Sequence, residues 1–304
     1  MRKTSAVLAT LSLAVLALTG CTAAPTYAGA SCERPSGDSG IAESVTVTGD
    51  LGAKPKVHVY TPVHAKKTTF TDVVTGDGRA VESGSQGLVA EISIFSGDTG
   101  EQIFQSSYDA AKSPVHNVNY WATQSPGLGK VLKCATEGSR VIAALTPEDF
   151  GVANLQGLGL AADDTAVFVI DVTEVYLPKA EGALQFNDAR GVPTVVRADD
   201  GTPGIIIPDN AAPKETVIQT LIKGDGPKVK KGDTLVTNFT AVGWDDKKVV
   251  NSTWGKDPSI GAAAQELIGT TVGSQVLIVL PGANGGAATA VVLDILGITT
   301  APTQ

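Results

Sequence analysis

The stretch VIQTLIKGDGP at residues 217–227 joins a run rich in β-branched residues to a Gly-Asp-Gly turn. Such a run is typical of a strand, and the glycines mark its end. An earlier stretch, FTDVVTGDGR at residues 70–79, has the same plan, and its Gly76 precedes Gly224 by 148 residues. One period is therefore the length of one domain, which predicts a duplication of a whole domain and not a solenoid.

Other segments follow the two turns in the same order. The matched segments are Val81–Gly84 with Val229–Gly232, Gly138–Val141 with Gly273–Val276, and Phe168–Asp171 with Val291–Asp294. We expect each copy to consist of strands and one short helix. In the first copy a helix is expected after Ser125-Pro126-Gly127, because proline starts helices, and a Gly-rich loop is expected over Thr146–Asp164. The expected strands are Val45–Thr48, Val57–Tyr60, Leu88–Phe95, Gln102–Gln105, Arg140–Leu145 and Ala166–Tyr176.

Composition limits the classes of function. The 304 residues suffice for two domains, and the 34 glycines and 16 prolines indicate many turns. A formal net charge of -8 argues against a nucleic-acid partner, because no basic stripe is present to displace counterions. His58, His64 and His116 are isolated and lack the spacing of metal ligands, so we expect no metal and no cofactor.

The first residues have the pattern of a targeting segment. Arg2-Lys3 precede an apolar run over Ala6–Leu18 that is too short for a membrane-spanning helix and fits a cleaved signal. The run ends in Leu18-Thr19-Gly20-Cys21, which resembles a bacterial lipoprotein box with Cys21 as the lipidated residue. An ordinary secretory signal is the alternative. The expected division is a signal peptide at 1–20, a flexible tether at 21–43, a first domain at 44–178, a linker at 179–193, a second domain at 194–298 and a tail at 299–304.

Two cysteines remain beyond Cys21. Cys32 lies in the expected tether and Cys134 in the first domain. Outside the cytoplasm such a pair can oxidise, and a bond would fix the tether to the domain. The sequence leaves open whether the two cysteines pair. The motif Gly-Asp-Ser-Gly at residues 37–40 is not read as a serine-protease site, because no histidine precedes it.

The order and spacing of these motifs resemble the FKBP-type peptidyl-prolyl isomerases. The resemblance covers most of the chain from Thr69 onward and implies an α+β fold of two tandem FKBP-like domains, each an antiparallel sheet wrapped around a short helix. It also implies an apolar pocket in which an X-Pro bond is rotated. That rotation faces a barrier of ~18–20 kcal/mol and requires neither a nucleophile nor a metal.

The resemblance places pocket residues in the first copy. The catalytic positions are occupied by Ile92, Phe104, Gln105, Leu128, Phe150 and Phe168. Phe150 occupies the place of a tyrosine that bonds the substrate carbonyl, and Gln105 occupies the place of an aspartate. Leu128 occupies the place of the tryptophan that floors the pocket.

The second copy keeps the frame of the family and less of its pocket. Phe239, Val250 and Asn251 are the equivalent positions there, and the stretch Ala262–Gln265 offers no floor residue. The late loop shortens to Pro281–Gly286 and carries no aromatic residue.

The leading hypothesis is an isomerase or foldase acting on X-Pro bonds of exported polypeptides, anchored by lipid on the extracytoplasmic side of the cell membrane. The alternative is a catalytically degenerate module that binds Pro-containing segments or a protein partner without turnover. A structural surface lipoprotein is a third hypothesis. Sequence leaves the client and the oligomeric state open.

Overall fold

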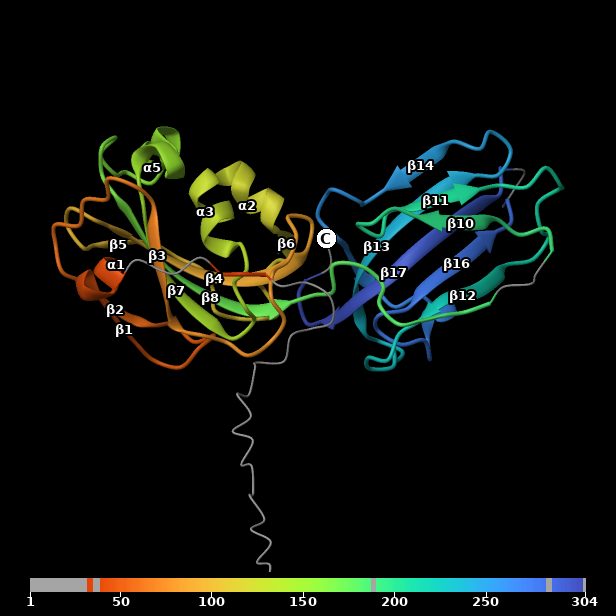
Figure 1. Cartoon of the computed structure of the whole chain (residues 1–304), viewed down its shortest axis with the longest axis horizontal. Coiled ribbons are helices and arrows are strands. Elements are labelled where there is room, and N and C mark those ends of the chain that lie inside the picture. The colour runs from red at the N-terminus through yellow and green to blue at the C-terminus, as the bar shows by residue number, and fades with distance from the viewer. Residues whose placement is uncertain (1–31, 35–38, 187–189, 283–285, 303–304) are drawn as a thin grey trace, which may run out of the picture.

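The computed structural model describes residues 32–34, 39–186, 190–282 and 286–302 (Figure 1). The predicted signal peptide, the lipidation at Cys21 and most of the predicted tether lie outside these residues. Within them, no helix combines the length and the apolar character that crossing a membrane requires.

The first half of the chain forms a six-stranded antiparallel sheet. Its main path is β3 (Thr69–Val74), β7 (Ser139–Leu145), β8 (Ala166–Val175), β4 (Gly87–Ser96) and β5 (Gln102–Gln105), and β6 (His116–Asn117) also pairs with β4. The central strands β4 and β7 are buried along their whole length, so their polar side chains, among them Glu91, Ser93 and Arg140, are buried as well.

The second half forms a seven-stranded sheet that repeats this strand order. The equivalent path is β12 (Val217–Lys223), β16 (Gln275–Leu280), β17 (Thr289–Thr299), β13 (Thr234–Gly243) and β14 (Val249–Ser252), with β15 (Ser259–Ala262) paired to β13. The additional strand β9 (Ala183–Leu184) pairs with β12, so the predicted linker contributes to this sheet. The repeat in the sequence is therefore matched by a repeat of strand order in the structure.

The Gly-Asp-Gly turns that reveal the repeat have a shared physical role. Thr136 Oγ1 donates to the carbonyl of Gly76 at 2.9 Å, and the amide of Gly76 donates to Ser139 Oγ at 3.0 Å. A Cβ at Gly76 would lie 2.0 Å from the carbonyl oxygen of Glu137, so only glycine fits. Thr271, Gly224 and Ser274 repeat these contacts in the second half.

A two-stranded hairpin covers one face of each sheet. The first hairpin is β1 (Val45–Thr48) with β2 (Lys56–Val59), preceded by α1 (Ser39–Ser44), and its Val45 and Val59 pack on that face. The second is β10 (Thr194–Arg197) with β11 (Pro203–Ile206). The hairpins belong to the repeated unit, and part of the segment predicted as tether is helical.

The opposite faces differ between the two halves. The face of the first sheet opposite its hairpin carries four helices, which lie together on one side of the sheet (Figure 1). They are α2 (Val118–Gln124), α3 (Pro126–Leu132), α4 (Pro147–Phe150) and α5 (Val152–Gly157). The prediction of a helix beginning at Ser125-Pro126 is confirmed by α3. The prediction of one helix and a continuous loop over 146–164 is wrong, because α4 and α5 form there. On the second sheet this face carries the 3-10 turn η1 (Gln265–Leu267).

A shared apolar core joins the two halves. It contains Val89, Val115, Tyr176 and Leu177 from the first half and Val236, Ile260, Leu296 and Ala301 from the second. The backbone continues the contact, since the amide of Leu177 donates to the carbonyl of Leu296 at 3.2 Å. Ala301 is 4% exposed, so the described part of the predicted tail is packed and not frayed. The described halves therefore share one apolar core across their junction.

Candidate functional site

A cavity of about 600 Å³ lies between the first sheet and the helices above it. Its apolar lining consists of Ala90, Ile92, Ile94, Phe104, Trp121, Leu128, Phe150, Ala153, Leu158 and Phe168. These side chains come from β4, β5, β8 and each of the four helices, so the fold gathers them from distant parts of the sequence. The volume is in the range of pockets that bind small molecules or side chains.

The apolar residues predicted as the site all line this cavity. Phe150 and Phe168 form its aromatic base, with ring centroids 5.2 Å apart and planes at 75°, which is a favourable edge-to-face arrangement. Thr146 starts the short helix α4 by accepting from the amide of Asp149 at 3.3 Å, and this places Phe150 over the sheet. Phe104 lies at the rim and is 44% exposed, so the cavity is open to solvent.

Gln105 does not line the cavity. Neighbouring residues of a strand point to opposite faces, and Phe104 occupies the cavity side. The side-chain amide of Gln105 donates instead to Ser93 Oγ at 3.3 Å. The prediction that Gln105 serves the site is therefore wrong, because the alternation of β5 directs its side chain away.

Trp121 is a wall residue that sequence reasoning missed. It lies on α2, which Asn117 starts by accepting from the amide of Tyr120 at 2.7 Å. The capping asparagine followed by an aromatic pair was the available signal. The indole N–H of Trp121 is buried and has no hydrogen-bond partner among the described residues. Trp121 thus contributes an aromatic wall from α2, the helix that precedes α3 with its Leu128.

The polar rim of the cavity is organised around Glu91. This buried carboxylate accepts from the hydroxyls of Ser106 and Ser113 and from the amide of Tyr108 at 2.9 Å. Ser106 Oγ also accepts from the amide of Ile92 at 2.9 Å. The contacts fasten the loop after β5 to the edge of β4 and so fix one side of the opening.

Tyr108 is part of this loop, and its hydroxyl lies 3.2 Å from Ser93 Oγ. Burial raises the pKa of Tyr108 to about 12, so its phenol stays protonated at neutral pH. Among the described residues, no group of three or more His, Cys, Asp or Glu side chains has the arrangement of a metal site. The cavity can desolvate and hold an apolar group, and its chemistry is that of a binding pocket with a polar edge.

The predicted pocket residues of the second half do not form an equivalent lining. Phe239 occupies the place of Ile92, but Val250 is 66% exposed and Asn251 is also exposed. The register explains the difference. Phe104 pairs with Ile94 of β4. The residue of β13 equivalent to Ile94 is Ala241, and it pairs with Asn251. Asn251 and not Val250 is therefore the structural equivalent of Phe104.

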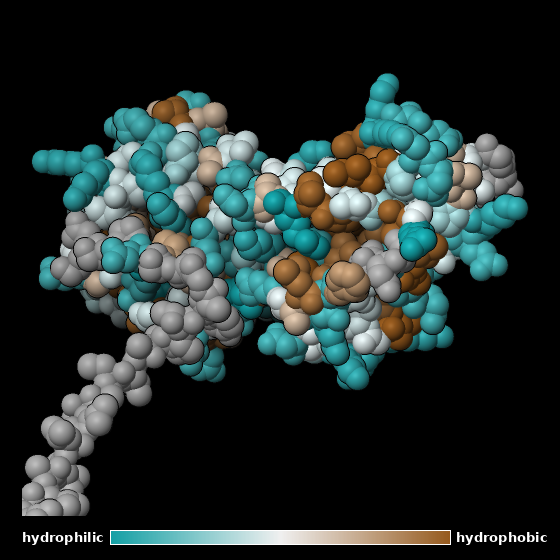
Figure 2. Space-filling view, turned by 45° about the vertical axis from the view of Figure 1, so that its right-hand side comes forward, coloured by the Kyte–Doolittle hydropathy of each residue, from teal (hydrophilic) through white to brown (hydrophobic). Residues whose placement is uncertain are grey.

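Figure 2 shows several apolar groups on the surface of the second half. The large exposed apolar side chains of that half are Leu184, Phe186, Val196, Ile206, Ile218, Val249, Val250 and Leu280. The second half thus exposes apolar side chains at its strands and lacks the four-helix cover that builds the cavity in the first half.

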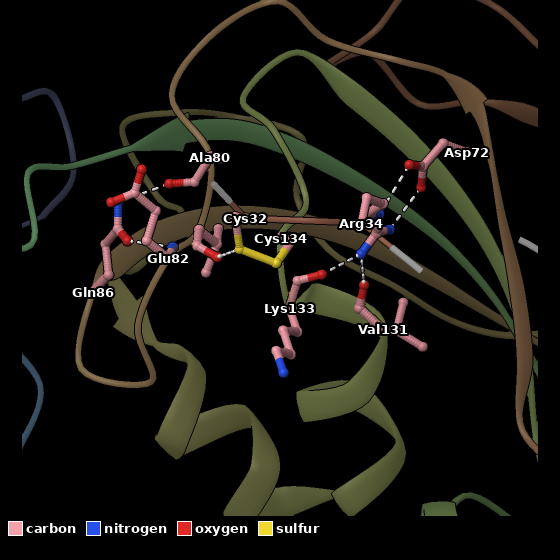
Figure 3. The surroundings of a disulfide bond; sticks show 10 residues. Cys32, Arg34, Asp72, Ala80, Glu82, Gln86, Val131, Lys133 and Cys134 are labelled. Carbon is pink, nitrogen blue, oxygen red and sulfur yellow. Dashed lines mark hydrogen bonds and ion pairs between the residues drawn. A yellow bond between two sulfur atoms is a disulfide. The ribbon is translucent and has the colours of Figure 1, made fainter. Parts of the chain in front are cut away.

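A disulfide bond fixes the N-terminal segment beside the cavity helices. Cys32 and Cys134 are bonded, with Cα atoms 5.5 Å apart (Figure 3). Arg34 reinforces the bond by a bidentate contact to Asp72 at 2.6 and 2.9 Å and by donating to the carbonyl of Val131 at 2.5 Å (Figure 3). The pairing that sequence left open is therefore formed, and it fixes the end of α3, the helix that carries Leu128.

Comparison with known proteins gives structural likeness only. No family model and no curated protein sequence matches the chain. The three FKBP domains of wheat FKBP73 are similar at 12% identity, with a TM-score of 0.35, over 77% of this chain and 95% of that one.

Two bacterial structures are also similar. Escherichia coli FkpA has 21% identity and a TM-score of 0.29, over 36% of this chain and 47% of that one. The putative peptidyl-prolyl isomerase FKBP12 of Mycobacterium tuberculosis has 20% identity and a TM-score of 0.25, over 36% of this chain and 85% of that one. Because all three TM-scores are below 0.5, the function of the cavity must be judged from its own residues.

Proposed function

We propose that the first half is an FKBP-like peptidyl-prolyl isomerase domain whose cavity holds the proline ring of an extended polypeptide. The observation that carries the proposal is the convergence of Ile92, Phe104, Leu128, Phe150 and Phe168 on one open cavity. The resemblance to the isomerases predicts these positions, and they come from separate strands and helices. Such an apolar lining suits a proline ring better than a charged or strongly polar ligand.

A cavity of this kind would accelerate the rotation without a nucleophile. A planar X-Pro amide is more charge-separated than the twisted amide of the transition state, so removing water favours the twisted form. Phe150 and Phe168 supply an apolar, water-excluding base for this step. Phe150 carries no hydroxyl to donate to the substrate carbonyl, so we expect acceleration to rest mainly on desolvation and to be modest.

The cellular setting belongs to the same proposal. A disulfide between Cys32 and Cys134 persists in oxidising compartments, which favours an exported protein. Export agrees with the signal pattern that ends at Cys21, where a lipid would anchor the chain to the membrane. The clients would then be exported polypeptides with exposed X-Pro bonds.

The second half has a different part in the proposal. Its Val250 and Asn251 are exposed and form no pocket wall with Phe239. We assign turnover to the first half alone and a binding or supporting role to the second.

The test is the isomerase rate of the soluble chain 22–304 on a short Leu-Pro peptide, with Phe104→Ala and Phe150→Ala as site variants. Phe186→Ala is the matched control, because Phe186 is 92% exposed and lies outside the cavity. Acceleration lost in the site variants and kept in the control supports the enzyme. Peptide binding that the site variants abolish, without acceleration in the parent chain, identifies the degenerate binding module instead. If the parent chain shows neither peptide binding nor acceleration, both the enzyme and the binding module are refuted.

A further inference from the structure

We propose that Asp257 of the second half is a positioning residue for the cavity of the first half, acting on its Trp121 wall. The inference rests on the proposed function, since it concerns the same cavity. The claim itself is that Asp257 fixes the position of Trp121, and this does not require turnover. Asp257 lies in the connection between β14 and β15 and reaches across the junction of the two halves.

The carboxylate of Asp257 holds the start of α2 by two contacts. Its Oδ1 accepts from the amide of Asn117 at 2.8 Å, and its Oδ2 lies 2.8 Å from Nδ1 of His116. The side chains of His116 and Asp257 are only 16% and 26% exposed, so water competes weakly for these contacts. Asn117 is itself the residue that caps α2, so one carboxylate fixes both the strand β6 and the helix that follows.

His116 in turn contacts two aromatic rings of α2, and one of these rings belongs to the cavity wall. The imidazole of His116 stacks on Tyr120 with centroids 3.7 Å apart and planes at 9°. It also meets the ring of Trp121 edge-on, with centroids 5.6 Å apart and planes at 90°. Trp121 lines the cavity. A displacement of the His116 ring therefore removes the support on one side of the wall.

The segment that carries Asp257 is rigidly placed. The next residue, Pro258, is buried against Gly87 of β4, where a Cβ would lie 3.0 Å from Cγ of the proline. Ile260, two residues later, belongs to the core shared by both halves. Because Asp257 is fixed to this core, it supplies α2 with a stable external support.

This arrangement gives the second half a function despite the loss of its own pocket lining. The four helices over the first sheet are short, between four and seven residues, and such helices depend on tertiary contacts for their position. The second half provides one of these contacts at the helix that bears Trp121. Of the two copies, the first thus forms the cavity, and the second supports the helix that forms one of its walls.

The test uses the soluble chain 22–304 labelled with 5-fluorotryptophan, whose three tryptophans give three fluorine resonances. The variants are Asp257→Ala, Asp257→Asn and His116→Gln, and Asp246→Asn is the matched control in an exposed turn of the same half. We measure the resonances and the Kd for a Leu-Pro peptide. Loss of a charge-assisted hydrogen bond at the support should weaken peptide binding about threefold to tenfold.

The expected result is a shifted or broadened Trp121 resonance with an unchanged Trp244 resonance in Asp257→Ala. Trp244 lies in the separate core under the second hairpin, so its constancy shows that the second half remains folded. Asp257→Asn retains an acceptor for the amide of Asn117 and should lie between Asp257→Ala and the parent chain. His116→Gln should disturb the Trp121 resonance while leaving the contact from Asp257 to Asn117 in place.

A Trp121 resonance in Asp257→Ala identical to that of Asp246→Asn overturns the proposal. If the parent chain shows no peptide binding and no turnover, the proposed function fails, and the Trp121 resonance still decides whether Asp257 positions the wall. If peptide binds and only the Trp121 resonance is insensitive to Asp257, the function stands and the positioning role is refuted.

Discussion

The ring of Tyr176, just after β8, lies directly against Gly297 on β17. A Cβ on Gly297 would fall 2.4 Å from Cδ1 of Tyr176, closer than nonbonded carbon atoms approach. The hydroxyl of Tyr176 is hydrogen-bonded to Thr299 Oγ1 at 2.8 Å, two residues further along β17. The junction of the two halves therefore depends on the absence of a side chain at position 297.

We predict that Gly297→Ala weakens this junction. The methyl group would force the buried Tyr176 ring to move, and overpacking of this kind costs about 1–3 kcal/mol. Urea unfolding of the soluble chain measures the loss. Gly261→Ala is the matched control, because Gly261 also lies in a strand of the second half and its Cβ would meet nothing within 4 Å. Equal stability of the two variants would contradict the packing argument.

Phe150→Tyr should increase isomerase activity. The substitution returns a hydroxyl to the base of the cavity, where it can donate to the substrate carbonyl, and a neutral hydrogen bond worth about 0.5–1.5 kcal/mol would raise kcat/KM by up to about tenfold. The measurement is the rate of cis-trans conversion of a Leu-Pro peptide. Gln105→Asp, the other change that the resemblance suggests, should give no gain, because that side chain faces Ser93 and not the cavity. A gain from Gln105→Asp alone would show that the strand face has been assigned wrongly.

The sequence predicted the strands better than the helices. Period and turn residues indicate strands locally, and the Gly-Asp-Gly turn after β3 is bonded to Thr136 and Ser139 at the start of the neighbouring strand β7. The segment of α4 and α5 has the pattern of a loop, because each helix is very short and glycines interrupt them. Helices of this length are formed by packing on the sheet, which no local pattern reveals.

The site residues divide in the same way, into those that a local motif indicates and those whose role depends on packing. Phe150 and Phe168 were found because their motifs resemble those of a family. Trp121 was missed because its helix precedes the expected one, and its role depends on how α2 lies over the sheet. The predicted match of Val250 with Phe104 is wrong by one residue, because Ile94 pairs with Phe104 and the equivalent Ala241 pairs with Asn251, with the strand irregularity at the same place in both halves. A one-residue error in matching two strands assigns each side chain to the opposite face, although the order of the motifs stays the same.

Cys32→Ser should lower the stability of the first half. The bond joins residues 102 positions apart, and a cross-link that closes a loop of this size stabilises a fold by about 2–4 kcal/mol. Urea unfolding with and without reductant measures the effect. Reductant should bring the parent chain to the stability of the variant and leave the variant unchanged. A variant as stable as the oxidised parent would show that the contacts of Arg34 alone hold the segment.

The stability of the second half should depend on pH through Asp294. This carboxylate accepts from the amide of Ala180 and from the side-chain amide of Gln275, both at 2.7 Å. Burial nevertheless raises its pKa to about 6, while the hydrogen bonds and the charge of Arg197 oppose the rise. Because the folded pKa lies above the unfolded value of about 3.9, the folded state binds the proton more tightly.

The contribution of Asp294 is thus complete below about pH 4 and is lost as the pH rises through about 6, a change of roughly 2–3 kcal/mol. Other carboxylates titrate over the same range, so the measured quantity is the difference in unfolding free energy between the parent chain and Asp294→Asn at each pH. That difference should fall between pH 4 and pH 7.5, whatever the absolute stability of the variant. A constant difference would mean that the hydrogen bonds from Ala180 and Gln275 outweigh burial and that Asp294 stays ionised in the folded chain.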